Sequence, residues 1–235
     1  MRYNYLYMDP WSADKVVANK KRKPIYICLT GNSGVGKSTL LKKLFSRLFS
    51  TDPDTIAIDE KSVHHSLLPY LFDDTNNYGY LIQLNFMIQR ALIIKSWLDK
   101  GFNLIMERSH LEDYIFINFM LNAGYISKWQ YDSYIKLWES IIELLIEPDI
   151  IAFINYPIEH SLAHLKHDEI NGIRPKEFPD EATKVKWITG WHTEYQSFTD
   201  KLPVHLRERV MACTHPDDIE NFTTLVTNKA MTLRR

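Results

Sequence analysis

The sequence predicts one α/β domain in which a parallel sheet carries helices on both faces, a three-layer fold. Short apolar, β-rich runs alternate with longer helical patterns along the 235 residues. A glycine-rich motif joins the first apolar run to the first helical pattern. With 45% hydrophobic residues, the chain can bury one large core. We therefore expect a single domain over residues 24–235, preceded by an N-terminal extension, residues 1–23.

Five apolar runs and seven amphipathic patterns are the expected elements, and no internal repeat separates them. The predicted strands are residues 24–30, 55–59, 102–107, 149–157 and 209–213. The predicted helices are residues 38–49, 83–100, 112–123, 127–147, 157–166, 185–198 and 215–231. The polar, turn-rich segment 166–181 is predicted to be a mobile loop between two helices. Helices of this length between strands favour parallel pairing, which gathers ligands at the carboxyl ends of the strands.

The stretch "LTGNSGVGKSTLLKKL" follows the first predicted strand and fits the template of a phosphate-binding loop. In such a loop the backbone amides and the positive end of the next helix cradle phosphates, a lysine reaches the outer phosphates, and a hydroxyl holds Mg²⁺. Lys37 and Ser38 fill the last two roles here. The expected nucleotide-binding residues are Gly31, Asn32, Ser33, Gly34, Val35, Gly36, Lys37, Ser38 and Thr39.

Charged residues follow two further predicted strands. Glu60 comes after the second strand, and Glu107 and Arg108 stand at the end of the third. Because parallel strands end at one edge of the sheet, these groups should converge beside the phosphate loop. A carboxylate there can organise Mg²⁺, and a guanidinium can stabilise a transferred phosphoryl group. We predict Glu107 as a metal-binding residue and Arg108 as a catalytic one, with a surface ion pair as the simpler alternative.

Composition excludes several classes of partner. The formal net charge of −1 provides no basic field to attract nucleic acid, and Lys20–Lys23 is interpreted as a solvated linker. No apolar stretch approaches the roughly 20 residues that cross a bilayer. Cys28 and Cys213 are too few for a disulfide framework, which favours a reducing, cytoplasmic location.

In order and spacing, these motifs resemble the deoxynucleoside kinase family over residues 24–198. The similarity rests on the phosphate loop, Glu60 in "IDEKS", Gln83 with Arg90, the "ERS" strand end with Asp113, and Arg174 with Glu177 in "GIRPKE". The stretch "RSHLEDYIF" is most similar to the bacterial deoxyadenosine and deoxyguanosine kinase branch. The resemblance implies a P-loop nucleoside-kinase-like fold with a lid at about residues 166–181 and a homodimer.

The resemblance also implies an activity: ATP and Mg²⁺ would phosphorylate the 5′-hydroxyl of a deoxynucleoside for nucleotide salvage. Lys37, Glu60 and Arg108 would be catalytic, with Glu60 as the base that accepts the hydroxyl proton. Arg174 would contact the donor. The predicted substrate-binding residues are Glu60, Gln83, Phe86, Arg90, Arg108, Asp113 and Glu177, with Glu177 on the 3′-hydroxyl.

Gln83 and Arg90 lie almost two helical turns apart and so share one helix face. A carboxamide offers a donor and an acceptor to the edge of adenine or cytosine, while Phe86 or Phe116 could cover the ring. In the family, an Arg and an Asp like Arg90 and Asp113 accompany purine or cytosine acceptance rather than thymidine. A purely structural Arg90–Asp113 pair remains an alternative.

Two other functions stay open. A nucleoside monophosphate kinase of the thymidylate type shares the loop and fold but needs cations for the acceptor's own phosphate. A nucleotide-binding subunit without activity is the second, because the lid segment carries Arg174 where the family commonly has several arginines. Phe72 also stands near the position of a family tyrosine that assists the 3′-hydroxyl. The histidines at 160, 164 and 167 could bind Zn²⁺, but a solvated helix face is the preferred interpretation.

Overall fold

A computed structural model describes residues 23–60 and 68–233 of the chain, so the predicted extension lies outside it except for Lys23. The strands are β1 (Tyr26–Gly31), β2 (Thr55–Ile58), β3 (Asn103–Glu107), β4 (Ile150–Ile154) and β5 (Val210–Cys213). The helices are α2 (Lys37–Phe49), α3 (Tyr70–Asp73), α4 (Thr75–Asp99), α5 (Asp113–Asn122), α6 (Lys128–Ile142), α7 (Ile158–Ile170), α8 (Glu181–Gln196), α9 (Phe198–Lys201), α10 (Val204–Arg207) and α11 (Ile219–Leu233), with 3-10 turns η2 (His110–Glu112) and η3 (Pro216–Asp218).

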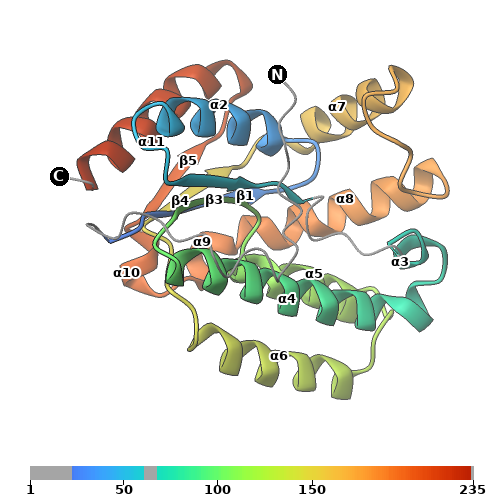
Figure 1. Cartoon of the computed structure of the whole chain (residues 1–235). Coiled ribbons are helices and arrows are strands. Elements are labelled where there is room, and N and C mark those ends of the chain that lie inside the picture. The colour runs from blue at the N-terminus through green and yellow to red at the C-terminus, as the bar shows by residue number, and fades with distance from the viewer. Residues whose placement is uncertain (1–22, 61–67, 234–235) are drawn as a thin grey trace.

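The five strands form one parallel sheet in the order β2-β3-β1-β4-β5. Helices cover both faces: α2 and α11 lie on one side and α4, α5 and α8 on the other, with α6 outside α4 (Figure 1). The central strands β1, β3 and β4 are buried along their whole length, as expected for a sheet covered on both faces. The predicted three-layer fold with a parallel sheet is confirmed.

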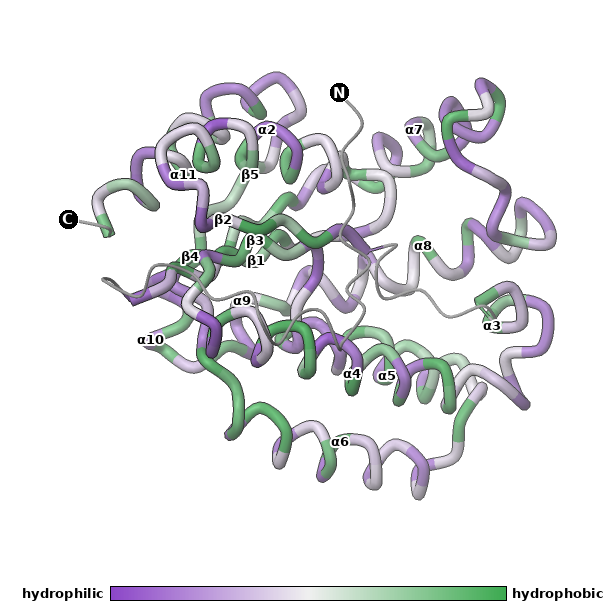
Figure 2. The backbone as a smooth tube through the Cα atoms, viewed as in Figure 1, coloured by the Kyte–Doolittle hydropathy of each residue, from purple (hydrophilic) through white to green (hydrophobic). Residues whose placement is uncertain are grey.

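Two apolar clusters fill the spaces between the layers. The larger includes Met106, Phe116 and Trp187 and packs the sheet against α4, α5 and α8. The smaller includes Leu40 and Val226 and packs the other face against α2 and α11. Figure 2 shows the strands mostly in hydrophobic colours, whereas the helices around them mix hydrophobic and hydrophilic residues. None of the described helices combines the length and apolarity needed to cross a bilayer.

Several predicted helix limits were wrong: α8 begins at Glu181 rather than at residue 185, and α11 begins at Ile219 rather than at residue 215. Helix α4 begins at Thr75 rather than at residue 83, although its first turns hold polar residues and a glycine. Gly79 packs so closely on α5 that an added Cβ would lie 2.5 Å from Met120 Cε. Tertiary packing therefore overrides the weak local propensity of this segment. Helix α6 ends at Ile142, before the predicted residue 147.

Another wrong limit concerns the predicted lid. Helix α7 continues to Ile170, so the first five residues of the expected loop 166–181 are helical, and the connection to α8 spans residues 171–180. The helix end is held by Glu169, which accepts a hydrogen bond from Lys184 of α8. A long-range ion pair of this kind leaves no local signal in the sequence.

Candidate active site

The phosphate-binding motif forms the turn between β1 and α2, as predicted. An added Cβ at Gly31 would lie 2.3 Å from the carbonyl oxygen of Ile154, so only glycine allows β1 and β4 to approach this closely. Gly36 caps α2 with a φ of 89°, and no side chain caps the helix. The first amides of α2 are therefore left for an anion, which the positive end of the helix also attracts.

Lys37 is buried at the base of this loop. Its Nζ donates a hydrogen bond to the carbonyl oxygen of Asn32 (2.7 Å) and lies 4.0 Å from Oε1 of Glu107. Burial, followed by repulsion from Arg108, lowers the pKa of Lys37 to about 8. The Lys37 ammonium group therefore lies beside the loop with little water around it. A bound phosphate would compensate its charge.

Ser38 and Glu107 provide oxygen donors that fit Mg²⁺. The Ser38 hydroxyl donates to both carboxylate oxygens of Glu107, at 2.9 and 3.1 Å. Burial raises the pKa of Glu107, while the nearby Lys37 lowers it. Among residues 23–60 and 68–233, no cluster of three or more His, Cys, Asp or Glu could hold a metal, the three histidines of α7 included. With Ser38 and Glu107 as the oxygen donors of the protein, a Mg²⁺ ion would take waters and phosphate oxygens as its other ligands.

Glu60 and Arg108 meet beside this pair, so the predicted convergence of the strand ends is present. Arg108 Nε donates to Oε1 of Glu60, and the Glu60 amide donates to Oε2 of Glu107 (3.4 Å). Arg108 is fully buried and has a φ of 63°, the one positive value outside glycine in the described residues. Such a backbone conformation is uncommon for a long side chain and concentrates at functional sites.

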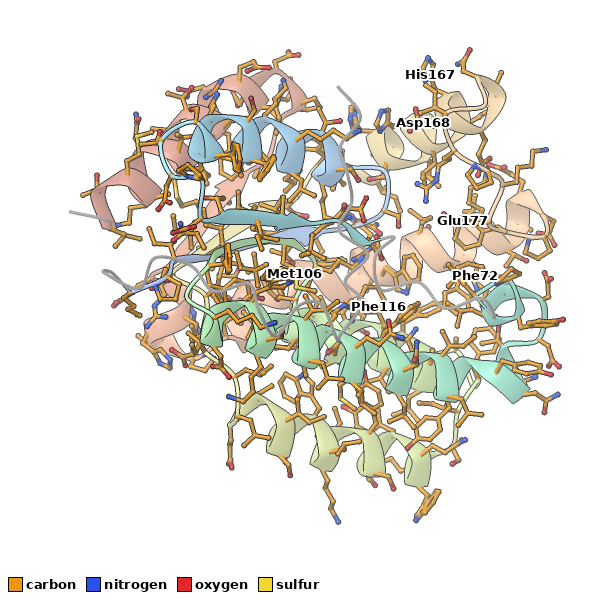
Figure 3. The ribbon with its side chains drawn as sticks, in the orientation of Figure 1. Phe72, Met106, Phe116, His167, Asp168 and Glu177 are labelled. Carbon is orange, nitrogen blue, oxygen red and sulfur yellow. The ribbon has the colours of Figure 1, made fainter. Side chains whose placement is uncertain are left out.

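An open pocket lies next to Glu60 and Arg108. Its lining comes from α3, α4, α5, α8, the phosphate loop and the lid connection, which lie far apart in the sequence. In full it comprises Ser33, Glu60, Leu68, Leu71, Phe72, Gln83, Phe86, Arg90, Arg108, Phe116, Arg174, Glu177 and Trp191. Figure 3 shows Phe72, Phe116 and Glu177 on different elements around this region. Seven polar or charged side chains and six apolar ones share this lining, and a concave site that combines apolar walls with convergent polar groups suits a small polar molecule.

Gln83 and Arg90 share the pocket wall on α4, as their spacing predicts. Oε1 of Gln83 and Nε of Arg90 are buried and have no hydrogen-bond partner among the described residues. A ligand with complementary donors and acceptors would satisfy them. Phe86 lies between them in sequence, and its ring stands 5.4 Å from the Arg90 guanidinium.

Asp113 differs in position from the other predicted substrate-binding residues. It is fully buried, pairs with Nη1 of Arg90, and does not line the pocket. Burial raises the pKa of Asp113 to about 7, and Arg90 opposes that shift. Asp113 thus lies behind Arg90 and can influence a ligand through that guanidinium.

The lid connection contributes Arg174 and Glu177, which both line the pocket and pair with each other at 2.8 Å. Phe72 also lines it and packs against Phe178. Tyr70 is the tyrosine nearest in sequence to Phe72, where the family commonly has a tyrosine. It is 45% exposed and packs on Tyr78.

Two polar residues of the site were not predicted. Glu112 is fully buried and accepts hydrogen bonds from the amides of Gly31 (3.3 Å) and Ser109 (3.1 Å). Glu112 forms a capping box with Ser109. The sequence "SHLE" displays this pattern, which could have identified Glu112. Tyr195 of α8 contacts Arg108 across 87 positions of sequence, and nothing in its local pattern distinguishes it from a core aromatic residue.

A parallel sheet with a glycine loop after β1, a buried lysine, and carboxylates at two strand ends defines a P-loop phosphotransferase. A family model described as deoxynucleoside kinase matches residues 27–226, and the chain belongs to this family of enzymes.

Curated relatives carry related names. The chain is 26% identical over 176 residues to the deoxyadenosine/deoxycytidine kinase of Bacillus subtilis, covering 73% of this chain and 75% of that protein. It is 28% identical over 145 residues to a deoxyguanosine kinase of Lactobacillus acidophilus, covering 60% of this chain and 61% of that protein.

A solved structure of deoxyadenosine kinase from M. mycoides with bound dCTP matches with a TM-score of 0.65 at 16% identity, over 88% of this chain and all of that one. A similarity at this level of identity bears on the fold alone.

Proposed function

We propose that this enzyme transfers the γ-phosphoryl group of ATP to the 5′-hydroxyl of a deoxynucleoside, in nucleotide salvage in the cytoplasm. The observation that carries the proposal is the position of Glu60. Glu60 lines the pocket and its carboxylate contacts Arg108, while its amide contacts the Glu107 that faces Lys37 and Ser38. A hydroxyl in the pocket would therefore stand between a base and the phosphate loop.

The chemistry follows from these contacts. Glu60 orients the 5′-hydroxyl and accepts its proton as the new oxygen–phosphorus bond forms, and the bond to the β-phosphate oxygen breaks to release ADP. Arg108 pairs with the Glu60 carboxylate and, with Lys37, stabilises the charge of the moving phosphoryl group. Mg²⁺ held by Ser38 and Glu107 would neutralise charge on the donor phosphates.

Base selection is assigned to Gln83 and Arg90. Both residues line the pocket, and their unpartnered Oε1 and Nε atoms are an acceptor and a donor, which suits the hydrogen-bonding edge of adenine, guanine or cytosine. Phe86 and Phe116 supply faces for the ring. Together with the Arg90–Asp113 pair, this favours purine or cytosine deoxynucleosides over thymidine. Glu177 lies in the same pocket and is proposed to bind the 3′-hydroxyl.

A monophosphate kinase would need cations for the acceptor's phosphate. Arg90, Arg108 and Arg174, the arginines in the pocket lining that the structure describes, each pair with a carboxylate. That arrangement favours an uncharged acceptor.

A radiolabelled transfer assay tests the proposal. It compares deoxyadenosine, deoxyguanosine, deoxycytidine, thymidine and their 5′-monophosphates as acceptors, with ATP as donor and with Mg²⁺ or EDTA. We expect transfer to at least one purine or cytosine deoxynucleoside, a weaker reaction with thymidine, and none with EDTA.

The variant that tests the base is Glu60→Gln, which keeps the size and polarity of the side chain. Loss of the base should lower kcat by about 100-fold or more, with nucleoside affinity changed little. Unchanged turnover would remove the base assignment. Faster transfer to a monophosphate, or ATP binding without any transfer, would replace the proposal by one of the alternative functions.

A further inference from the structure

Arg108, the guanidinium closest to the reacting groups, is held by a tyrosine that the mechanism above does not use. Nη1 of Arg108 donates a hydrogen bond to Oη of Tyr195 at 2.8 Å. The same hydroxyl donates to Oε1 of Glu112. Both partners are fully buried, so the phenol stands in an enclosed chain from guanidinium to carboxylate.

Glu112 connects this chain to the phosphate loop. Its Oε1 also accepts from the amide of Gly31, the first residue of the loop, and its Oε2 from the amide of Ser109. Oε1 lies 3.6 Å from Nη1 of Arg108, too far for a direct hydrogen bond. The Tyr195 hydroxyl therefore fills the gap and gives the guanidinium a directional partner at this position.

Three further hydrogen bonds hold the Arg108 guanidinium, and two of them are long. Nη2 donates to Oγ of Ser33 at 3.4 Å. On one side Nε meets Glu60, and Nη1 has a second, longer bond to the carbonyl oxygen of Gly31 (3.3 Å). The ring of Phe116 lies 4.8 Å from the guanidinium carbon and restricts its plane without choosing its rotation. Burial strongly raises the pKa of Tyr195, so the phenol stays neutral and keeps its proton for Glu112.

We propose that Tyr195 is a positioning residue for catalysis, whose hydroxyl orients the Arg108 guanidinium toward Glu60 and the transferred phosphoryl group. This inference rests on the proposed function, because Arg108 acts there on the moving charge. Tyr195 lies on α8, the helix that directly follows the lid connection. The helix thus supports the catalytic arginine from the side of the lid.

The test is Tyr195→Phe, which removes only the hydroxyl. The ring packs on Phe153 and Phe198, and these contacts remain in the variant. We expect kcat to fall by about tenfold or more while KM for ATP and for the nucleoside changes by less than about threefold. The matched control is Tyr156→Phe, because that buried hydroxyl contacts Cys213 outside the site. It should leave kcat unchanged.

A double-mutant cycle separates positioning from a general structural effect. Arg108→Gln alone should lower kcat strongly, and adding Tyr195→Phe should lower it no further, because the hydroxyl acts through the guanidinium. A fall by the same factor in both backgrounds would overturn the inference. So would a folded Tyr195→Phe enzyme with the kcat of the unmodified chain.

A structure of Tyr195→Phe gives a readout that does not depend on activity. We expect the Arg108 guanidinium to turn away from Glu60, and an unchanged contact would refute the positioning role. If the unmodified chain transfers no phosphoryl group to any deoxynucleoside, the proposed function fails while this structural result still decides the role of Tyr195.

Discussion

At the scale of single residues, the site is a set of buried charges whose pKa values depend on one another. At the edge of the sheet, Lys37 faces Glu107 and Arg108 pairs with Glu60. Burial disfavours each charged form, and opposite neighbours restore it. The pKa of Arg108 is raised by Glu60 and Tyr195 in spite of burial, whereas burial and the repulsion of Arg108 lower that of Lys37. Lys37 is therefore the cation of the site that can lose its proton near neutral pH.

This difference predicts a pH dependence. Lys37 must be protonated to bind phosphates, and its pKa in the free enzyme is about 8. We expect kcat/KM for ATP to be constant below that pH and to fall as the pH rises through it, since this ratio reports groups of the free enzyme. The Lys37→Arg variant should be slower, but its kcat/KM for ATP should stay constant to higher pH because a guanidinium stays charged. A decline that persists near pH 8 in Lys37→Arg would assign it to another group.

At the scale of elements, helices α7 and α8 fix the two ends of the lid connection. Lys184 of α8 donates to Glu169 of α7 (2.6 Å) and lies 2.7 Å from Glu181. The side chains of Lys184 and Glu169 are only 5% and 7% exposed, so water cannot replace either partner. On its other side α8 approaches α5 so closely that a Cβ on Gly190 would lie 2.1 Å from the Phe119 ring. The helix that carries Tyr195 is therefore anchored from two directions.

Removing one partner of the α7–α8 ion pair should destabilise the protein. Lys184→Met leaves Glu169 buried without its cation, and we expect the free energy of unfolding to fall by about 2 kcal/mol or more. The measurement is urea unfolding monitored by tryptophan fluorescence. Lys184→Met combined with Glu169→Leu should recover much of the loss, because no unpaired charge remains. Equal stability of the single and double variants would show that the buried charge is not the cause.

At the scale of the whole molecule, an exposed apolar stripe remains after both faces of the sheet are covered. Leu81, Ile88 and Leu92 lie on one face of α4 and are 61%, 45% and 65% exposed. Their spacing of seven and four residues places them in one row. Contiguous exposed apolar side chains commonly mark protein interfaces. We propose that the homodimer implied by the family resemblance forms through this face.

Light scattering after size-exclusion chromatography tests the dimer. The unmodified chain should have twice the monomer mass, and Leu92→Arg should shift it toward the monomer because an interface disfavours a buried unpaired charge. Leu225→Arg, at an exposed leucine of α11, is the matched control and should stay dimeric. A monomeric unmodified chain, or a dimeric Leu92→Arg variant, would argue against this face.

Predictions from the sequence succeeded where the signal is local. The segment from β1 through the phosphate loop to α2 is contiguous, so its apolar run, glycines and helical spacing describe one connected unit. The meeting of Glu60 with Glu107 followed from the rule that parallel strands end at one edge. The limits of α4 and α7 were wrong because packing of Gly79 and the ion pair of Glu169 decided them.

The sequence by itself determined the three-layer fold, the phosphate loop and the strand-end carboxylates, because periodicity and glycine placement act over neighbouring residues. Only the tertiary structure decided that Asp113 stands behind Arg90, that Arg174 pairs with Glu177, and that Tyr195 supports Arg108. Burial leaves the Arg90–Asp113 and Arg108–Tyr195 pairs no water as a partner, so each group must find its partner in the protein, at whatever sequence distance the packing of helices on the sheet provides.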